Sequence, residues 1–479
     1  MAVESVNYQC LACGGTMQLD PATGLLKCEY CESEFEPAQV EAAYAAKQAA
    51  QDAKAQAATE RAEAGERSAF EQMGDVNGAS SALTQEVIGE AVATSSAQEN
   101  PIDAYLSRAS WNEEERQGLR SFICSSCGAA LTVDASTAVT ECPYCGNTAV
   151  VAGTFGGEAK PDYVIPFRTS KQDATNSLSE YYKGKKFLPS KFADANRLEH
   201  IQGVYVPFWL YDGNAEGSGT FNAENTRVYT SGDEEVTETD VYSCYRAGDV
   251  NFERIPADAS NKMPNGHMDA IEPFDYSEMK PFSTAYMPGY LAERYDEDPT
   301  VCRPRAELRM TNSLEEELRS TVVGYDSVDP TTVDANITFK GVAQALLPVW
   351  MLHTRWEDED YLFAMNGQTG RFVGNLPVSK IKVLLWFLAI LAVLGGAFFC
   401  ADYFWLQFDD LTTSILVDGG VPAIISVVVC YTFYKQMKTA EEKTEAQAYI
   451  TAEGLNLTAH SDTYVTTRVT RVKIRDDDD

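Results

Sequence analysis

Two long apolar runs dominate the hydrophobic pattern near the end of this chain. Val383–Ala401 is nineteen residues without a charge, close to the ~20 residues that an α-helix needs to cross a bilayer. Leu411–Tyr434 is a second run, interrupted by Asp418 and Pro422. The pattern predicts a two-helix transmembrane hairpin over residues 383–434, with Asp418 at the level of the lipid headgroups.

Charges at the ends of these runs predict their orientation. Basic residues flank the hairpin and only acids lie in its loop; they are Lys380, Lys382, Lys435 and Lys438, and Asp402, Asp409 and Asp410. By the positive-inside rule both flanks lie in the cytosol. We therefore expect a protein of the cell membrane that contacts lipid through two spans, with both termini cytoplasmic. A buried hairpin in a soluble protein is the alternative.

Between residues 160 and 380 the pattern changes to short alternating runs separated by turn residues. The strand candidates are Val204–Tyr211, Val236–Tyr245, Ala345–Leu352 and Tyr361–Met365. Capping-box patterns at Ser170–Asp173 and Ser313–Glu316 predict the starts of two helices. Asn366–Gly370 is typical of a hairpin turn, because asparagine and glycine tolerate a positive φ. We predict an α+β cytosolic domain with an antiparallel sheet.

Two segments of this region resemble each other: Val206-Pro-Phe-Trp-Leu-Tyr211 and Leu347-Pro-Val-Trp-Met-Leu352. Each has a proline near the start of a strand and a tryptophan two positions later. Equivalent strands of a duplicated half-domain, or two similar core strands, both explain the likeness.

The regions on either side of this domain are polar. Residues 37–66 predict a solvated helix and residues 67–100 a flexible segment, so we treat 37–110 as a linker. In the tail, 435–479, we expect a short helix at Thr439–Glu453 and strands at Leu455–Thr458 and Tyr464–Arg475. These strands can join the chain's own sheet or extend the sheet of a partner.

Eight of the twelve cysteines fall into four Cys-x-x-Cys pairs. Fourteen residues separate the two pairs of each set, and the eight cysteines are Cys10, Cys13, Cys28, Cys31, Cys124, Cys127, Cys142 and Cys145. This spacing is typical of four-cysteine zinc ribbons, which we place at residues 1–36 and 111–152 as two small β units. A redox Cys-x-x-Cys motif, the alternative, needs a βαβ setting that neither copy has.

The two ribbons are copies of one unit. A shift that brings Cys10 onto Cys124 also brings Tyr30 onto Tyr144, and it places Glu32 where the second copy has Gly146. Four thiolates leave no open position for water on the metal. We therefore expect two structural zinc ions, and no catalytic or cofactor-binding residues.

Charge and the N-terminal sequence narrow the function. The net charge is −33, which repels the phosphates of nucleic acids, so we expect no nucleic-acid partner. The first ten residues have neither a basic nor an apolar region, so we expect no signal peptide and a reducing compartment.

Few other residues suggest chemistry. The string Lys183-Gly-Lys-Lys186 lacks the upstream glycine and the hydroxyl of a nucleotide-binding loop. Asp258 and Ser260 can supply an acid and a hydroxyl to a pocket, although a turn explains them equally well.

The ribbons, Tyr205–Trp209, Ile255–Ser260, Leu347–Trp350, Asn366–Gly370 and the late hairpin occur in the same order in a group of bacterial proteins. On these motifs the chain resembles the TFIIB-type zinc-ribbon membrane proteins, a YdjG-like family, over most of its length except the 37–110 linker. Some relatives are labelled PriA-like helicases through their cysteine pairs alone, a label that the missing nucleotide loop argues against. The resemblance implies work with flotillin-like (SPFH) or PspA-like proteins in envelope-stress complexes, and it supplies no catalytic residues.

We therefore expect a membrane-anchored cytosolic zinc-ribbon adaptor or scaffold protein. An enzyme of unknown reaction with its site in residues 160–380 stays open, and acids converging in a pocket would favour it. A nucleic-acid-binding zinc-ribbon protein is a further alternative, which the acidic first ribbon argues against. Its acids face only Lys27, and they are Glu4, Asp20, Glu29, Glu32, Glu34 and Glu36.

Overall fold

The middle of the molecule is built on one large mixed sheet. The computed structural model describes residues 10–473 except 14, 16, 29, 45, 47–118, 135–141, 148–149, 154–159, 196–199 and 407–413. Within these residues twelve strands form the sheet; their main order is β10 (Lys280–Pro281), β7 (Tyr163–Val164), β12 (Ser327–Trp356), β8 (Gln202–Ser231), β11 (Leu291–Glu293), β5 (Ala130–Asp134), β4 (Leu119–Cys124) and β6 (Val150–Gly153). Four more strands complete it: β9 (Glu234–Asp258) pairs with β8, β15 (Ile450–Lys473) with β9, β13 (Glu359–Asn366) with β12, and β14 (Phe372–Gly374) with β13.

The sheet is mixed, which corrects the expectation of a wholly antiparallel one. β11 runs parallel to β8 and β7 runs parallel to β12, whereas the long pairs β12–β8, β8–β9 and β9–β15 are antiparallel. The two parallel neighbours are strands of two or three residues that arrive after long connections, and so short a strand leaves no alternating pattern to recognise.

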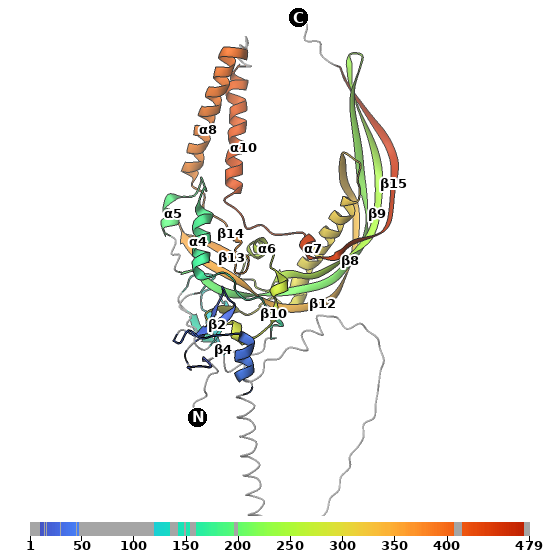
Figure 1. Ribbon diagram of the computed structural model, residues 1–479. Helices are drawn as coiled ribbons and strands as arrows, with labels where there is room; N and C mark the ends of the chain where they lie inside the picture. The colour runs from blue at the N-terminus through green and yellow to red at the C-terminus, as the bar shows by residue number, and fades with distance from the viewer. Residues whose placement is uncertain are drawn as a thin grey trace, which may run out of the picture.

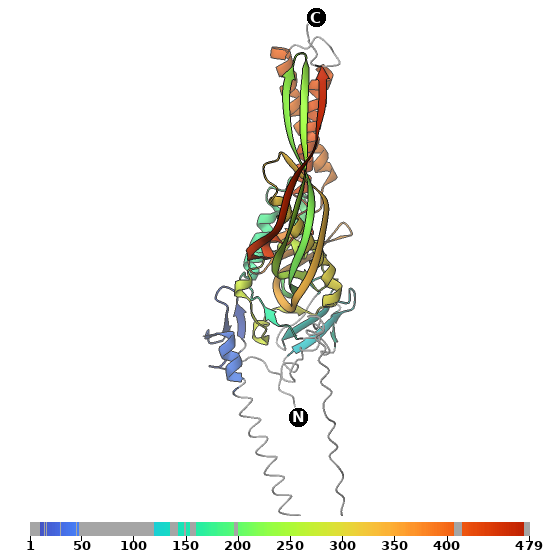
Figure 2. The same ribbon diagram turned by 90° about the vertical axis from the view of Figure 1, so that its right-hand side faces the viewer.

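Four strands are much longer than the sequence predicted. β8 and β12 have 30 residues each, β9 has 25 and β15 has 24. Their inner parts lie under the helices, and their outer parts, residues 212–252, 327–341 and 450–473, curve upward as a four-stranded arm (Figures 1 and 2). The predicted cores at Val204–Tyr211 and Ala345–Leu352 are the stretches where both faces of the sheet are buried. Along the arm the glycines and polar residues of a half-exposed sheet hide the strand from a hydrophobic pattern.

One face of the arm is covered by α7 (Pro299–Ser320). The helix begins at the N-cap Asp298, whose carboxylate accepts hydrogen bonds from Thr300 N and Val301 N. The predicted helix start at Ser313 is therefore wrong, because Ser313 lies inside α7, where it is buried. The packing core between helix and arm contains Phe221, Cys244, Val250, Met310 and Leu314, among others.

Two local predictions are confirmed. α4 (Lys171–Tyr182) opens with a full capping box, in which Ser170 N donates to Asp173 Oδ2 at 2.8 Å and Asp173 N donates back to Ser170 Oγ. The turn after Asn366 joins β13 to β14, and Gly370 there has φ +77°.

The two similar segments lie side by side in the sheet. β12 and β8 are antiparallel neighbours with Leu347 opposite Val206 and Ala345 opposite Phe208. Both tryptophans are buried, with Trp209 donating to Glu297 O and Trp350 donating to Thr169 Oγ1.

Two helices rise from the body on the same side as the arm (Figure 1). α8 (Lys380–Ala401) continues into a π-helical turn at Asp402–Leu406, and another such turn, Leu416–Gly420, precedes α10 (Val421–Lys435). Both are long and apolar enough to cross a membrane, and little of either helix is buried against the rest of the described chain. A core helix of a soluble protein would be mostly buried, so this low burial argues against the soluble alternative.

The tail differs from its prediction. No helix forms at Thr439–Glu453; an extended connector runs from α10 to a single 3-10 turn at Gln447–Tyr449, and β15 begins at Ile450. Side chains of α7 hold the connector, since Arg309 Nε donates to Glu445 O at 3.1 Å and Asn312 Nδ2 to Thr444 O at 2.9 Å. The two predicted tail strands are a single strand, β15, and it joins the chain's own sheet through β9, the first of the two expectations.

The first four-cysteine unit has a small sheet of its own, in the order β1 (Met17–Asp20), β2 (Leu25–Cys28) and β3 (Glu34–Phe35). Residues 37–44 are helical, and Val40 is buried in the core rather than solvated. The rest of the predicted linker, including the flexible segment at 67–100, lies outside the described residues. The two four-cysteine units flank the base of the body on opposite sides (Figure 2).

Candidate metal centres

Each Cys-x-x-Cys pair forms the same tight turn. The amide of the first cysteine donates to the carbonyl five residues on: Cys10 to Gly15, Cys28 to Ser33, Cys124 to Ala129 and Cys142 to Asn147, all within 2.8–3.0 Å. In three of the turns the residue four positions on donates back to the carbonyl of the first cysteine; these donors are Glu32, Gly128 and Gly146. This backbone pattern turns both sulfur atoms of a pair toward one point.

The residue that closes the turn needs a left-handed backbone. Gly128 and Gly146 have φ +75° and +65°, and glycine adopts such angles without steric cost. Glu32 has φ +58° in the first unit, where a side chain costs about 1–2 kcal/mol. Glu32, which stands where the second copy has Gly146, therefore strains the backbone of this turn.

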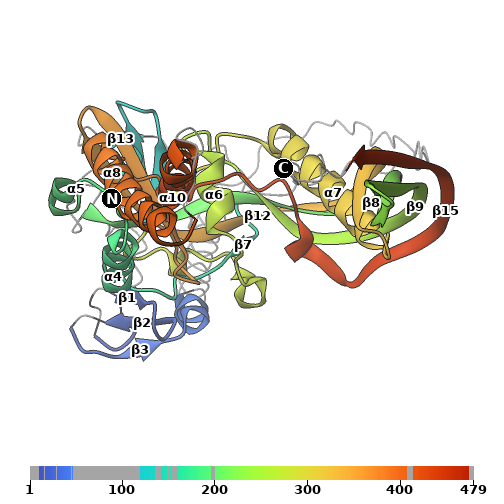
Figure 3. The ribbon, with the colours of Figure 1, turned by 90° about the horizontal axis from the view of Figure 1, so that it is seen from above.

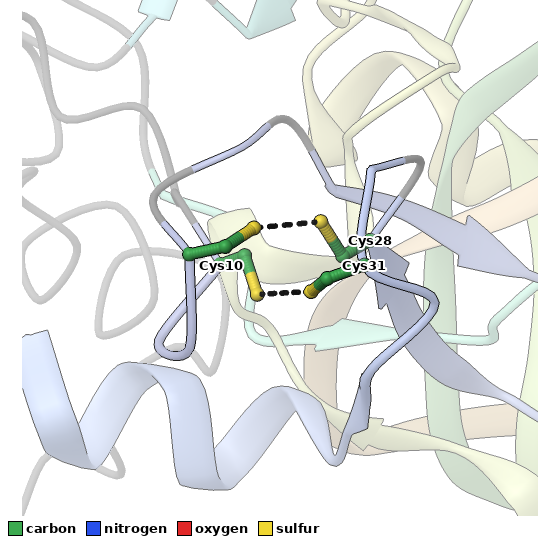
Figure 4. Close-up of side chains that lie close together, drawn as sticks. Cys10, Cys28 and Cys31 are labelled. Atoms are coloured by element: carbon green, nitrogen blue, oxygen red, sulfur yellow. Dashed lines mark hydrogen bonds between the residues drawn. The ribbon is translucent and has the colours of Figure 1, made fainter.

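The four sulfur atoms of the first unit converge. Cys10 Sγ lies 3.4 Å from Cys31 Sγ, and Cys13 Sγ lies 3.5 Å from Cys28 Sγ. Figure 4 shows the side chains of Cys10, Cys28 and Cys31 pointing toward one another. The sulfur atoms of all four cysteines of this unit lie within 4.8 Å of one another.

The second unit repeats this geometry. Cys124 Sγ lies 3.6 Å from Cys145 Sγ, and Cys127 Sγ lies 3.7 Å from Cys142 Sγ. A disulfide would bring sulfurs to about 2.05 Å. A zinc ion with Zn–S bonds of about 2.3 Å at the centre of a tetrahedron places its sulfurs about 3.8 Å apart. Both sets of four cysteines therefore have the donors and the spacing to hold one metal ion each.

The second unit is fixed to the body by its last turn. Tyr144 is only 8% exposed, and its hydroxyl donates to Glu293 Oε2 at 2.5 Å. Ser260 Oγ donates to the other oxygen of the same carboxylate at 2.7 Å. Burial raises the pKa of Glu293 to about 8 and raises the pKa of Tyr144 as well. The tyrosine thus ties the metal-binding turn to β11 through a buried acid.

Strand pairing and a close contact add to this attachment. β5 pairs with β11, with Thr132 opposite Ala292, so the second unit continues the large sheet. On the other side, a Cβ atom at Gly146 would lie 2.9 Å from His353 Nδ1, so any larger residue there would have to displace the histidine side chain of β12.

The first unit attaches by a different face. Its buried residues Met17, Leu19 and Leu26 belong to the core cluster that also contains Phe167 and Tyr290 of the body. Ser283 Oγ donates to Glu41 after β3. Tyr30, the counterpart of Tyr144, is 77% exposed.

Asp258 and Ser260, the acid and the hydroxyl considered in the sequence analysis, form buried contacts with other side chains. Asp258 and Ser260 are fully buried at the end of β9. Arg305 Nη1 donates to Asp258 Oδ1 at 2.6 Å, while burial raises the pKa of this carboxyl to about 6. Ser260 turns instead to Glu293. No local pattern could have identified Glu293 or His353, because both reach the second unit through tertiary contacts.

These observations define a class of protein: a chain with two four-cysteine clusters near its N-terminus, a mixed-sheet region and two long apolar helices. Among curated proteins, the chain is 38% identical over 254 residues to the uncharacterized protein YdjG of Bacillus subtilis (strain 168), which covers 53% of this chain and 73% of YdjG. The chain belongs to the YdjG family. No family model matches it, and no solved structure matches it.

Proposed function

We propose that this protein is a membrane-anchored adaptor of the TFIIB-type zinc-ribbon kind. In this proposal two structural zinc ions fold the cysteine units, and α8 and α10 hold the body at the cytosolic face of the cell membrane. The observation that carries it is the joint presence, in one chain, of two complete four-sulfur sites and two outward-facing apolar helices.

The chemistry of the donors supports zinc in a structural role. Eight cysteines supply four sulfurs to each site, and soft thiolates in a tetrahedron favour zinc over magnesium or calcium. When bound, such an ion supplies folding free energy rather than a reactive water, because no ligand position stays open.

Charge and aromatic side chains support two spans with both flanks cytosolic. Lys435 Nζ lies over the ring of Tyr431 and Lys438 Nζ over the ring of Tyr434, at the end of α10. Tyr403 and Phe404 are exposed at the opposite end of the hairpin. Aromatic belts at both interfaces and bases on the cytosolic side are the pattern of a membrane hairpin.

The arm sets a constraint on anchoring. It extends in the same direction as α8 and α10 (Figures 1 and 2) and carries charged residues such as Arg227, Glu234 and Asp240. An open sheet edge cannot lie in hydrocarbon, because its backbone groups would lose water without replacement. Insertion of the helices therefore requires that the arm and the helix pair diverge above the base of the hairpin.

Two measurements test the anchor and the metals. Reporters fused before Val383 and after Lys438 should both report the cytosol, and a reporter between Leu406 and Asp418 the outside; opposite signals from the two flanks would exclude a hairpin. Metal analysis of fully reduced protein should find two zinc ions per chain, and one ion or none would contradict the proposal.

The proposed partners are proteins. The resemblance stated above favours flotillin-like (SPFH) or PspA-like proteins, and the acidic surface of the first unit around Asp20, Glu34 and Glu36 disfavours nucleic acid. Crosslinking in native membranes followed by purification tests this choice. Recovery of DNA or RNA in place of a membrane-associated protein would overturn it.

A further inference from the structure

The base of the apolar hairpin is surrounded by lysines from three separate segments. Residues 183–191, 376–382 and 435–440 contain eight lysines and no acid, in a chain whose net charge is −33. We call these segments the lysine collar; its members are Lys183, Lys185, Lys186, Lys191, Lys380, Lys382, Lys435 and Lys438. Three of them come from the connection between α4 and α5 (Ser190–Ala195) and Lys191 comes from α5 itself, about 190 residues before the helices they approach in the fold.

Tertiary contacts bring the body segment to the helix ends. Lys186 Nζ lies 5.3 Å from the ring centroid of Trp386 in α8, and Lys185 Nζ donates to Gln436 O just after α10. Lys382 Nζ donates to Leu188 O at 2.6 Å and to Ser190 Oγ at 3.0 Å. Figures 1 and 3 show α4 and α5 (Ser190–Ala195) beside the base of α8.

An aromatic pair fixes the same junction from within. Phe187 is fully buried and packs edge-to-face on Phe433 of α10, with ring centroids 5.8 Å apart. Phe433 also contacts Trp386 of α8 at 5.9 Å. The segment is thus anchored by its apolar residue, while Lys183, Lys186 and Lys191 stay exposed around it.

We propose that the lysine collar binds the anionic headgroups of the cytosolic leaflet. Lysines next to an apolar helix end stand at headgroup depth when the helix spans a bilayer, and each is worth about fivefold in binding to an anionic surface. The acidic body would otherwise be repelled by that surface. The segment Lys183–Lys186 lacks the features of a nucleotide-binding loop, and in this proposal it faces the phosphates of the lipid headgroups.

This inference rests on the proposed membrane anchor, and the experiment separates the two. The full chain, loaded with zinc, is reconstituted into nanodiscs of phosphatidylcholine with about one third phosphatidylglycerol. The immobilised fractions of spin-labelled phosphatidylglycerol and spin-labelled phosphatidylcholine give the preference for the anionic lipid. In a separate step on native membranes, release of the protein into the soluble fraction by an alkaline wash overturns anchor and inference together.

The variant Lys186→Glu/Lys191→Glu tests the collar itself, because both side chains are exposed and the ring of Trp386 that Lys186 contacts is exposed as well. It should lower the preference for phosphatidylglycerol by about threefold or more, and Lys186→Arg/Lys191→Arg should retain it. Lys171→Glu/Lys340→Glu changes the net charge equally at exposed positions of α4 and the arm, and should leave the preference unchanged. Insertion without a preference for the anionic lipid, or an equal loss in both charge-reversed variants, overturns the inference and leaves the anchor intact.

Discussion

The two four-cysteine units share one spacing, one set of turns and one tyrosine position, yet they meet the body in opposite ways. The second unit inserts Tyr144 against Glu293 and adds β5 to the large sheet. The first unit packs through its small sheet and leaves Tyr30 77% exposed. The comparison teaches that the metal-binding geometry is local, whereas the use of the surface beside it depends on what the rest of the chain presents.

The acidity of the two surfaces follows the same division. Around Tyr30 the first unit has Glu32, Glu34 and Glu36, where the second has Gly146, Thr148 and Val150. Acidic side chains suit a turn that stays in water, and their absence from the second copy is compatible with the burial of Tyr144. The two copies share their ligand spacing, and the residues beside the ligands distinguish them.

The largest difference should follow from loss of one metal ligand. Cys28→Ser and Cys142→Ser should each remove one zinc ion, and metal binding is worth about 10–16 kcal/mol to such a unit. For Cys28→Ser, loss of amide protection should stay within the first unit. For Cys142→Ser it should spread to β11, since β5 pairs with that strand. Metal analysis and hydrogen exchange measure both effects, and equally local losses would remove the distinction.

Removal of the two tyrosine side chains compares the attachment directly. Tyr144→Ala should lower the free energy of unfolding by about 3–5 kcal/mol, because it empties a buried ring site and leaves Glu293 without one donor. Tyr30→Ala should change it by less than about 0.5 kcal/mol, as at other exposed positions. Denaturant unfolding of both variants tests this, and similar losses would mean that Tyr30 also supports the fold.

The buried acid under Tyr144 should give the second unit a pH dependence. Burial raises the pKa of Glu293 from 4.5 to about 8, so the unfolded chain loses this proton first. Its stabilising contribution is complete below pH 4.5 and is lost as the pH rises through about 8. Between about pH 6.5 and pH 8 the free energy of unfolding should fall by at most about 1.4 kcal/mol per pH unit. Glu293→Gln should flatten this slope, and an unchanged slope would assign it to another group.

A matched pair of glycines isolates the contact with His353. Gly128→Ala and Gly146→Ala both place a side chain at positive φ, but only the second brings a Cβ within 2.9 Å of His353 Nδ1. Gly146→Ala should therefore cost about 1–2 kcal/mol more than Gly128→Ala. Thermal unfolding of the single variants and of Gly146→Ala/His353→Ala measures the coupling. Equal losses of unfolding free energy in the two variants would show that the His353 side chain moves aside for the added methyl group.

The smallest effect concerns the strained turn of the first unit. Glu32→Gly should stabilise this unit by about 1 kcal/mol, because glycine adopts φ +58° without the clash of a side chain. Competition with a chelator should show slower zinc release from the first unit and unchanged release from the second. Faster release after the substitution would contradict the backbone argument.

Several features could be predicted from short stretches of sequence because their causes are local. The cysteine pairs, the positive φ of Gly128 and Gly146, the capping box at Ser170 and the turn after Asn366 each depend on a few neighbouring residues. The apolar runs of α8 and α10 were visible for the same reason, since composition alone fixes their length.

The long strands and the tail could not be predicted in this way. The outer parts of β8 and β12 pair over many residues whose pattern is polar and glycine-rich, and their pairing depends on α7 covering one face. Thr439–Glu453 has helix-forming residues, but Arg309, Asn312 and Ser313 hold its backbone extended on α7. Tertiary hydrogen bonds here outweigh the local propensity.

The sequence by itself determined that the chain has two like sets of four cysteines and two apolar helices, because spacing and composition act over short range. Only the tertiary structure decided that Tyr144 is buried and Tyr30 exposed, that the sheet is mixed, and that Lys186 lies beside Trp386. Each of these joins residues far apart in the chain, and packing of the whole body, rather than any local pattern, selects which of them meet.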